Sequence, residues 1–193
     1  MVTPHFDGQR QAMNESPHTL SEINSLGQDD FVRIIGPVFE HSPWIAEAAW
    51  LKRPFASLGA LHQALCQTVA GAGEEKQLAL IRAHPDLVGR ANQVGTLTLA
   101  STNEQASAGL TQLTPDEIEA FQTNNAAYHA KFGFPFVICA RLNKKEAILE
   151  GFRVRLNHSR EQEIETALEE IGKIAWLRLK DLTNKHSSTD GCG

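Results

Sequence analysis

Residues 159–182 read SREQEIETALEEIGKIAWLRLKDL, and this stretch indicates the fold class more clearly than any other part of the chain. Its apolar residues recur at steps of three and four, at Ile164, Leu168, Ile171, Ala175 and Leu179. That spacing is typical of one face of an amphipathic α-helix. We therefore expect a long helix that buries this face against the rest of the protein.

Helical signals continue outward from this stretch through most of the chain. A hydroxyl residue followed by proline, a common helix start, occurs at Ser42-Pro43 and at Thr114-Pro115. Ser101 and Glu104 have the spacing of a capping box at the start of another helix. The further helices are expected at residues 28–39, 44–51, 57–70, 74–83, 101–110, 114–131 and 146–157. The prediction is an all-α, single-domain helical bundle of about eight helices.

Three kinds of segment interrupt this helical pattern. Residues 85–100 form a long central loop, which is long enough to be functional. Residues 136–140, FVICA, have strand propensity, but no second strand is available to pair with them, so we expect a buried extended piece or a helix start. Ser21 and Asn24 are expected to cap only a short turn. Residues 1–18 and 184–193 are polar and are predicted to be flexible tails around a domain at 19–183.

Composition excludes several classes of function. The 18 Lys and Arg against 23 Asp and Glu give a net charge of −5, which does not favour binding to nucleic acid or to an anionic membrane. No apolar run approaches the roughly 20 residues of a membrane span, and no signal peptide is evident. The three cysteines, Cys66, Cys139 and Cys192, form no CxxC pair and so indicate neither a disulfide framework nor a zinc ribbon. We expect a cytoplasmic protein.

His84 is the first candidate for chemistry. It follows an apolar helix and precedes Pro85 and a glycine-containing loop, a position that can direct an imidazole into a pocket. The alternative is a histidine that only interacts with the C-terminus of its helix. Segment 101–105 is the second candidate, since a helix start can hold an anion, and its alternative is the capping box alone. Arg153 and Arg155 point to different helix faces, and either could bind a carboxylate or lie in solvent.

Other motifs with readable chemistry are missing from the sequence. None of the eight histidines forms an HxxxH or HExxH pair, so a metal site would need ligands from distant segments. No nucleophile elbow, phosphate-binding loop or dinucleotide-binding glycine fingerprint occurs. The sequence therefore does not support the cofactor-dependent classes that such motifs identify.

Several short motifs, in order along the chain, resemble the 2-oxo-4-hydroxy-4-carboxy-5-ureidoimidazoline (OHCU) decarboxylase family. The similarity extends from about Leu20 to Leu182. The motifs are Phe39-Glu40-His41-Ser42-Pro43-Trp44, Arg53-Pro54-Phe55, Ala83-His84-Pro85-Asp86-Leu87, Ser101-x-x-Glu104-Gln105, Phe132-Gly133-Phe134-Pro135-Phe136 and Arg155-Leu156-x-His158.

The resemblance implies a cofactor-free carboxy-lyase that converts OHCU to (S)-allantoin and CO₂ during urate breakdown. By matching positions, His84 would be the catalytic acid/base, Glu104 would assist it, and Arg155 would hold the substrate carboxylate. The implied substrate-binding residues are Pro85, Ser101, Thr102, Asn103, Gln105, Phe136, Val137, Ile138, Cys139 and Ala140. No metal ligand is implied.

The resemblance also implies an all-helical homodimer with a small-molecule substrate and no nucleic-acid or membrane partner. Some relatives are fused to the hydrolase of the preceding step, which suggests functional coupling to such an enzyme. Two alternatives remain open from the residues. One is a non-catalytic helical module that binds a small ligand or a partner, and the other is a metal-dependent hydrolase with scattered histidine ligands.

Overall fold

The computed structural model describes residues 17–89 and 98–184, and the regular secondary structure of these residues is entirely helical. The predicted all-α class is confirmed. The α-helices are α1 (Leu20–Ser25), α2 (Gln28–Ile35), α3 (Trp44–Trp50), α4 (Leu58–Ala70), α5 (Glu74–Arg82), α6 (Leu99–Ser107), α7 (Pro115–Phe132), α8 (Lys145–Arg155) and α9 (Arg160–Thr183). Two 3₁₀ helices, η1 (Gly36–Val38) and η3 (Ala140–Leu142), complete the described elements.

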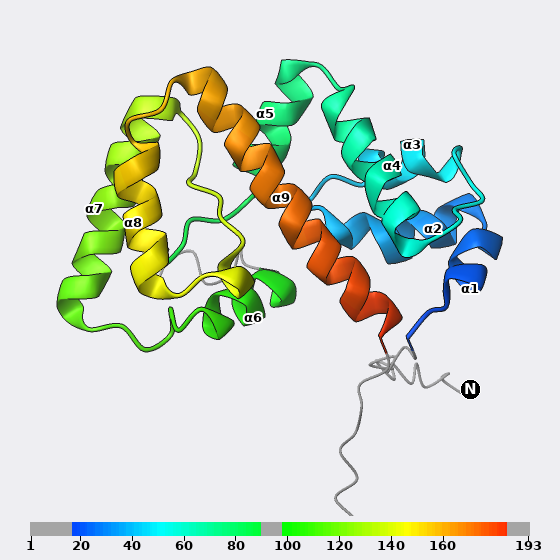
Figure 1. The fold of residues 1–193 in the computed structure, drawn as a ribbon, viewed down its shortest axis with the longest axis horizontal. Coiled ribbons are helices and arrows are strands. Elements are labelled where there is room, and N and C mark those ends of the chain that lie inside the picture. The colour runs from blue at the N-terminus through cyan, green and yellow to red at the C-terminus, as the bar shows by residue number, and fades with distance from the viewer. Residues whose placement is uncertain (1–16, 90–97, 185–193) are drawn as a thin grey trace, which may run out of the picture.

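Helix α9 is the central element of the fold. Figure 1 shows it crossing the molecule diagonally, with α1 to α4 on one side and the paired helices α7 and α8 on the other. Helices α4 and α5 and the turn η1 pack against α9. Of its predicted apolar face, Ile171, Ala175 and Leu179 are buried, whereas Ile164 and Leu168 pack partly buried at the edge of the core. The helix expected from residues 159–182 is therefore present, capped by the Ser159 side chain.

The starts of helices α1 and α6 differ from the expectations. Thr19, not Ser21 or Asn24, opens the chain with a complete capping box to Glu22, so the expected turn is the helix α1. Helix α6 begins at Leu99, because the Thr98 side chain accepts the Ser101 N–H at 3.2 Å. Ser101 is therefore the third residue of the helix rather than its cap, and its hydroxyl is free for a tertiary contact.

The first long helix was also predicted too long. Residues 28–39 divide into α2 and the 3₁₀ turn η1, which contains Pro37. Proline has no backbone N–H and its ring conflicts with the preceding helical turn, so the α-helix ends just before it. The chain then turns at His41, which has a positive φ of 45°, before α3 begins.

Residues 136–139 are buried or partly buried and belong to no regular helix, and the 3₁₀ helix η3 begins at Ala140, so the segment is a buried irregular piece that leads into a helix start. In place of a partner strand, side chains satisfy the backbone of this piece: Arg155 Nη1 donates to the Val137 carbonyl at 2.8 Å, and the Cys139 N–H donates to Glu170 Oε2 at 2.7 Å. Buried peptide groups need such partners, since an unpaired one costs about 1–3 kcal/mol. We refer to residues 136–140 as the wall segment below.

Several expectations concern residues that the structure does not describe. Most of the predicted tails, half of the central loop, and Cys192 lie outside residues 17–89 and 98–184. Within those residues, Cys66 and Cys139 are free thiols. No helix in the described part of the chain is both long and apolar enough to span a membrane.

Candidate active site

His84 is held by the end of its own helix. Helix α5 ends at Arg82, and the His84 N–H then donates to the Ile81 carbonyl at 3.1 Å. Its Nδ1 lies 2.9 Å from the Leu80 carbonyl oxygen. Because a carbonyl oxygen can only accept, Nδ1 carries the proton and Nε2 is the unprotonated nitrogen of the neutral ring. The side chain is only 7% exposed.

A small cavity of about 30 Å³ lies beside His84. Segments that are far apart in the sequence line it: the end of α5, the start of α6, the wall segment and α9. The lining residues are His84, Pro85, Leu87, Ser101, Glu104, Gln105, Phe136, Val137, Ile138, Ala140, Ile174 and Arg178. This volume is about that of one water molecule, so the lining side chains must move apart to admit a larger molecule.

Arg178 of α9 is the positive charge of this cavity. Its Nε donates to Glu104 Oε1 and its Nη2 to Glu104 Oε2, both at 2.8 Å, which is a bidentate pair. Nη1 donates to Glu40 Oε2 at 3.2 Å. Arg178 thus lies between two carboxylates, and it is 7% exposed. A guanidinium at the edge of a water-poor cavity is suited to bind a substrate carboxylate.

Burial controls the charge of His84. It lowers the pKa of the imidazole to about 4, although the Leu80 carbonyl and the negative charge of Glu40 act in the opposite direction. Arg178 and His41 lower this pKa further. His84 is therefore neutral near pH 7 and can accept a proton on Nε2. In this arrangement the Leu80 carbonyl provides the orienting contact of His84, and Glu104, which is expected to assist His84, pairs with Arg178.

The cavity brings together most of the residues expected in the site. Nine of them line it: His84, Pro85, Ser101, Glu104, Gln105, Phe136, Val137, Ile138 and Ala140. Thr102 and Asn103 do not, and both are exposed on α6. Cys139 is also absent from the lining, and its N–H is already bound to Glu170. A helix can direct only part of five consecutive residues toward one neighbour, which explains the division of residues 101–105.

Gln105 connects the cavity to the segment that follows His84. Its Oε1 accepts the Val88 N–H at 3.2 Å, and its Nε2 lies 3.4 Å from the Asp86 carbonyl. Val88 has a positive φ of 53°, which is unusual for a β-branched residue. The Gln105 amide therefore helps to hold an unfavourable turn directly after the His84-Pro85 pair.

Arg155 lies outside the cavity lining. It is 6% exposed and donates to both oxygens of Glu163 and to the Val137 carbonyl. Its guanidinium also lies 4.3 Å from the centre of the Phe136 ring. Arg153, two residues earlier, is exposed and pairs with Glu150. The two arginines point to different faces of α8, as predicted. Arg155 binds the backbone of the wall segment and does not reach the cavity.

Sequence reasoning missed Arg178 and Glu40 as residues of this region. Arg178 stands three residues after Ala175 and directly before Leu179 on the buried face of α9, and a charge next to the apolar stripe is a signal that can be read from sequence. Glu40 lies within the first motif that carries the family resemblance. No spacing rule connects either residue to His84, because the three come from separate segments.

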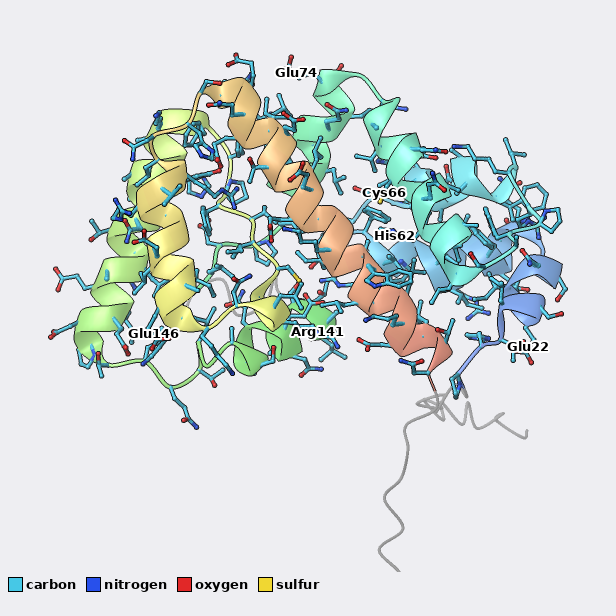
Figure 2. The ribbon with its side chains drawn as sticks, in the orientation of Figure 1. Glu22, His62, Cys66, Glu74, Arg141 and Glu146 are labelled. Carbon is cyan, nitrogen blue, oxygen red and sulfur yellow. The ribbon has the colours of Figure 1, made fainter. Side chains whose placement is uncertain are left out.

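Larger hollows occur elsewhere on the described surface. One of about 430 Å³ is lined by residues of α4, α5 and α9, including Cys66, and contains none of the expected site residues. Figure 2 shows Cys66 and His62 on α4 beside α9, where His62 Nε2 lies 2.8 Å from the Gly172 carbonyl. Among residues 17–89 and 98–184, no group of three or more His, Cys, Asp or Glu side chains is arranged to hold a metal ion.

Comparison with known proteins identifies the family. The model of the OHCU decarboxylase family matches residues 24–180. The chain belongs to the OHCU decarboxylase family. A curated 2-oxo-4-hydroxy-4-carboxy-5-ureidoimidazoline decarboxylase of Halalkalicoccus jeotgali is 43% identical over 171 residues, which are 89% of this chain and 95% of that protein. The predicted family, and with it the expectation of a decarboxylase, is confirmed.

Two further relatives are longer than this chain. The uric acid degradation bifunctional protein PucL of Bacillus subtilis is 37% identical over 171 residues, which are 89% of this chain but 34% of PucL. A crystal structure of (S)-allantoin synthase matches with a TM-score of 0.70 and 29% sequence identity. That match covers 86% of this chain, which spans about half (54%) of the solved chain. The decarboxylase fold thus also occurs as part of longer proteins.

Proposed function

We propose that this protein decarboxylates OHCU to (S)-allantoin and CO₂, with His84 as the acid/base and without a cofactor. The observation that carries the proposal is the convergence of His84, Ser101, Glu104 and Arg178 on one small cavity in a member of this family. The names of the related proteins further support OHCU as substrate and allantoin as product.

The substrate supplies its own electron sink. OHCU carries a ring C=N next to the carbon that bears the carboxylate and the hydroxyl. When the bond to the carboxylate breaks, CO₂ leaves and the electron pair forms a C=C bond to the ring carbon that bears the ureido group. The electrons of the C=N bond move onto the ring nitrogen, which takes up a proton. A proton is then added to the ring carbon that bears the ureido group, and the hydroxyl loses its proton to become the carbonyl of allantoin. The protein need only orient the carboxylate and manage these protons.

Each of these tasks has a suitable group at the cavity. The neutral His84 accepts or delivers a proton through Nε2, and Arg178 holds the substrate carboxylate in place of the expected Arg155. Glu104 exchanges its contact with Arg178 for the substrate and then assists the proton transfers. Phe136 and Ile174 form apolar surface around the reacting carboxylate. Protonation from a single side accounts for a product of one handedness.

The deciding experiment generates OHCU in the cuvette from urate, with urate oxidase and the hydrolase of the preceding step. Circular dichroism then follows the allantoin that forms. We expect a rapid, optically active signal with this protein that a metal chelator does not change. A slow, optically silent decay equal to the protein-free control would contradict the proposal and favour a non-catalytic binding module. Loss of the signal with chelator would favour the metal-dependent alternative.

A His84→Gln variant assigns the acid/base. Glutamine keeps a polar side chain of similar reach but cannot exchange protons near neutral pH, so we expect stereospecific turnover to fall by about 100-fold or more. The far-ultraviolet circular dichroism should stay helical. Turnover equal to that of the wild type would contradict the role of His84 and leave the rest of the proposal standing.

The setting of the reaction is part of the same proposal. We propose a cytoplasmic homodimer that takes its unstable substrate from the hydrolase of the preceding step. The bifunctional uric acid degradation proteins among the relatives support such coupling. Sedimentation of the purified protein tests the dimer. Addition of the hydrolase tests coupling, because a docked pair would shorten the lag before allantoin appears.

A further inference from the structure

Glu40 contacts two residues that line the cavity, Ser101 and Arg178, but does not line the cavity itself. It belongs to the turn between η1 and α3, immediately before His41 with its positive φ of 45°. A positive φ is unfavourable for a residue other than glycine, so this conformation persists only where surrounding contacts require it. Glu40 is 2% exposed. A fully buried carboxylate needs several polar partners, and the partners of Glu40 come from two distant segments.

Both carboxylate oxygens of Glu40 bind residues of the cavity region. Oε1 accepts hydrogen bonds from the hydroxyls of Ser101 and Thr98, the latter at 2.9 Å. Oε2 accepts from Arg178 Nη1 at 3.2 Å. Ser101 and Arg178 line the cavity, and the Ser101 hydroxyl also lies 3.3 Å from Arg178 Nη2. One buried carboxylate therefore contacts two residues that line the cavity.

The contacts of Arg178 divide its guanidinium into two edges. Glu40 binds Nη1, and the carbonyls of Val38 and Pro37 lie 3.4 and 3.5 Å from the same nitrogen. Nε and Nη2 hold Glu104, which lines the cavity. Burial would raise the pKa of Glu40, but the Ser101 hydroxyl and Arg178 outweigh burial and keep this pKa below its usual value. Glu40 is thus a fixed negative charge.

We propose that Glu40 is a positioning residue of the active site. It holds the Ser101 hydroxyl and the Nη1 edge of Arg178, so that Nε and Nη2 stay directed at the cavity while Glu104 is exchanged for the substrate carboxylate. The inference rests on the proposed function for the identity of the substrate. The contacts of Arg178 can be measured in the absence of any substrate. The competing interpretation is that Glu40 only ties three segments of the fold together.

Kinetics separate these interpretations. Glu40→Gln keeps the size of the side chain but removes its negative charge. Arg178 Nη1 then faces a neutral amide instead of a carboxylate. We expect kcat/KM to fall about 100-fold, as small displacements of positioning groups can produce. Glu40→Asp restores the charge with a shorter reach and should recover part of this loss. The effect of Glu40→Gln should also be smaller in a Ser101→Ala background, because the two residues act together.

Glu163→Gln is the matched control. Glu163 is likewise buried and paired with an arginine, Arg155, but does not line the cavity. A general loss of buried charge pairing would affect both variants equally. We expect kcat/KM of the folded Glu163→Gln variant to stay at the wild-type value. Equal kcat/KM losses in Glu40→Gln and Glu163→Gln would overturn the positioning role.

A measurement without substrate keeps the inference independent of the proposed function. The Nη1 protons of Arg178, which donate to Glu40, should give a protected NMR signal, assigned by its loss in Arg178→Lys. We expect this signal to disappear through exchange with water in Glu40→Gln and to persist in Glu163→Gln. If the wild type fails to turn over OHCU, the proposed function fails, and this signal still decides whether Glu40 holds Arg178.

Two further results overturn the inference. One is an unchanged Arg178 signal in Glu40→Gln, and the other is an unchanged kcat/KM in the same variant of an active enzyme. If Glu40→Gln does not fold, both measurements are made on Glu40→Asp. Reduced kcat/KM and a weakened Arg178 signal in that variant support the positioning role, and wild-type values for both contradict it.

Discussion

Two arginines, Arg155 and Arg178, are alike in their burial and in their pairing with a glutamate. Both are less than a tenth exposed, and both bind a glutamate through Nε and Nη2. The Arg155 cluster joins α8 to α9 through Glu163, which is 0% exposed and also binds the Tyr128 hydroxyl and His158 Nδ1. The Arg178 cluster joins α9 to α6 and to the turn at Glu40.

The two clusters differ in what lies next to them. Neither Arg155 nor Glu163 lines the cavity, and their polar atoms bind one another, Tyr128 and the Val137 carbonyl. Arg178 and Glu104 both line the cavity beside His84. Burial and charge pairing alone therefore do not distinguish a structural ion pair from a functional one. We propose that contact with the cavity beside His84 does, and the following predictions test that distinction.

The largest expected effect is on activity, in Arg178→Lys. Lysine keeps the charge but cannot bind two carboxylates through a planar edge. We expect kcat/KM to fall by about 1000-fold, in the range seen when a single substrate-stabilising donor is removed. Stopped-flow decay of freshly generated OHCU measures this. An Arg155→Lys variant with the same kinetic loss would break the comparison between the two clusters.

The next effect is on stability, in Glu163→Gln. Removing the charge leaves the buried Arg155 without its ionic partner, which costs about 3–5 kcal/mol for pairs of this kind. Urea unfolding at pH 7 measures the change in free energy of unfolding. A loss well below 1 kcal/mol would show that the Arg155 cluster contributes little to the stability of the fold.

A smaller effect follows from the titration of His84. Its pKa in the folded protein is about 4, below the usual value of 6.5. Between these values the unfolded chain binds a proton that the folded protein does not, so stability falls as the pH decreases from 6.5 toward 4. Above pH 6.5 His84 makes no such contribution. Urea unfolding at pH 7 and pH 5 should therefore show a larger loss in the wild type than in His84→Gln.

The same low pKa predicts the pH dependence of the reaction. The neutral form of His84 persists down to about pH 5, so its contribution to kcat/KM should stay constant from pH 8 to pH 5 and decline below that. A pH–rate profile measured against the uncatalysed decay at each pH tests this. A decline centred near pH 6.5 would indicate a solvated imidazole and contradict the burial described here.

The smallest effect is expected for Arg153→Ala. Arg153 is two residues from Arg155 but lies in solvent, paired only with the exposed Glu150. Exposed pairs contribute little, because water screens them and long side chains lose entropy when they pair. We expect neither kcat/KM nor the urea midpoint to change measurably. A clear loss of activity would indicate that this face of α8 also contributes to the site.

The sequence predicted most of the helices and much of the cavity. Periodicity and caps depend on neighbours within a few residues, so α4, α7 and α9 were predicted within one or two residues of their observed bounds. Position by position, the resemblance named nine of the twelve lining residues. It also named Thr102, Asn103 and Cys139, since a linear motif does not show which side chains of a segment face inward.

What the sequence by itself determined is the helical class, the central helix and His84 at the end of α5. These follow from local spacing and from backbone preferences that act over a single helical turn. Only the tertiary structure decided that Arg178, rather than Arg155, reaches the cavity and that Glu40 stands behind it. Glu40, Ser101 and Arg178 meet because three distant segments pack against one another. The physical reason is that an ion pair depends on distance in space, on which spacing along the chain carries no information.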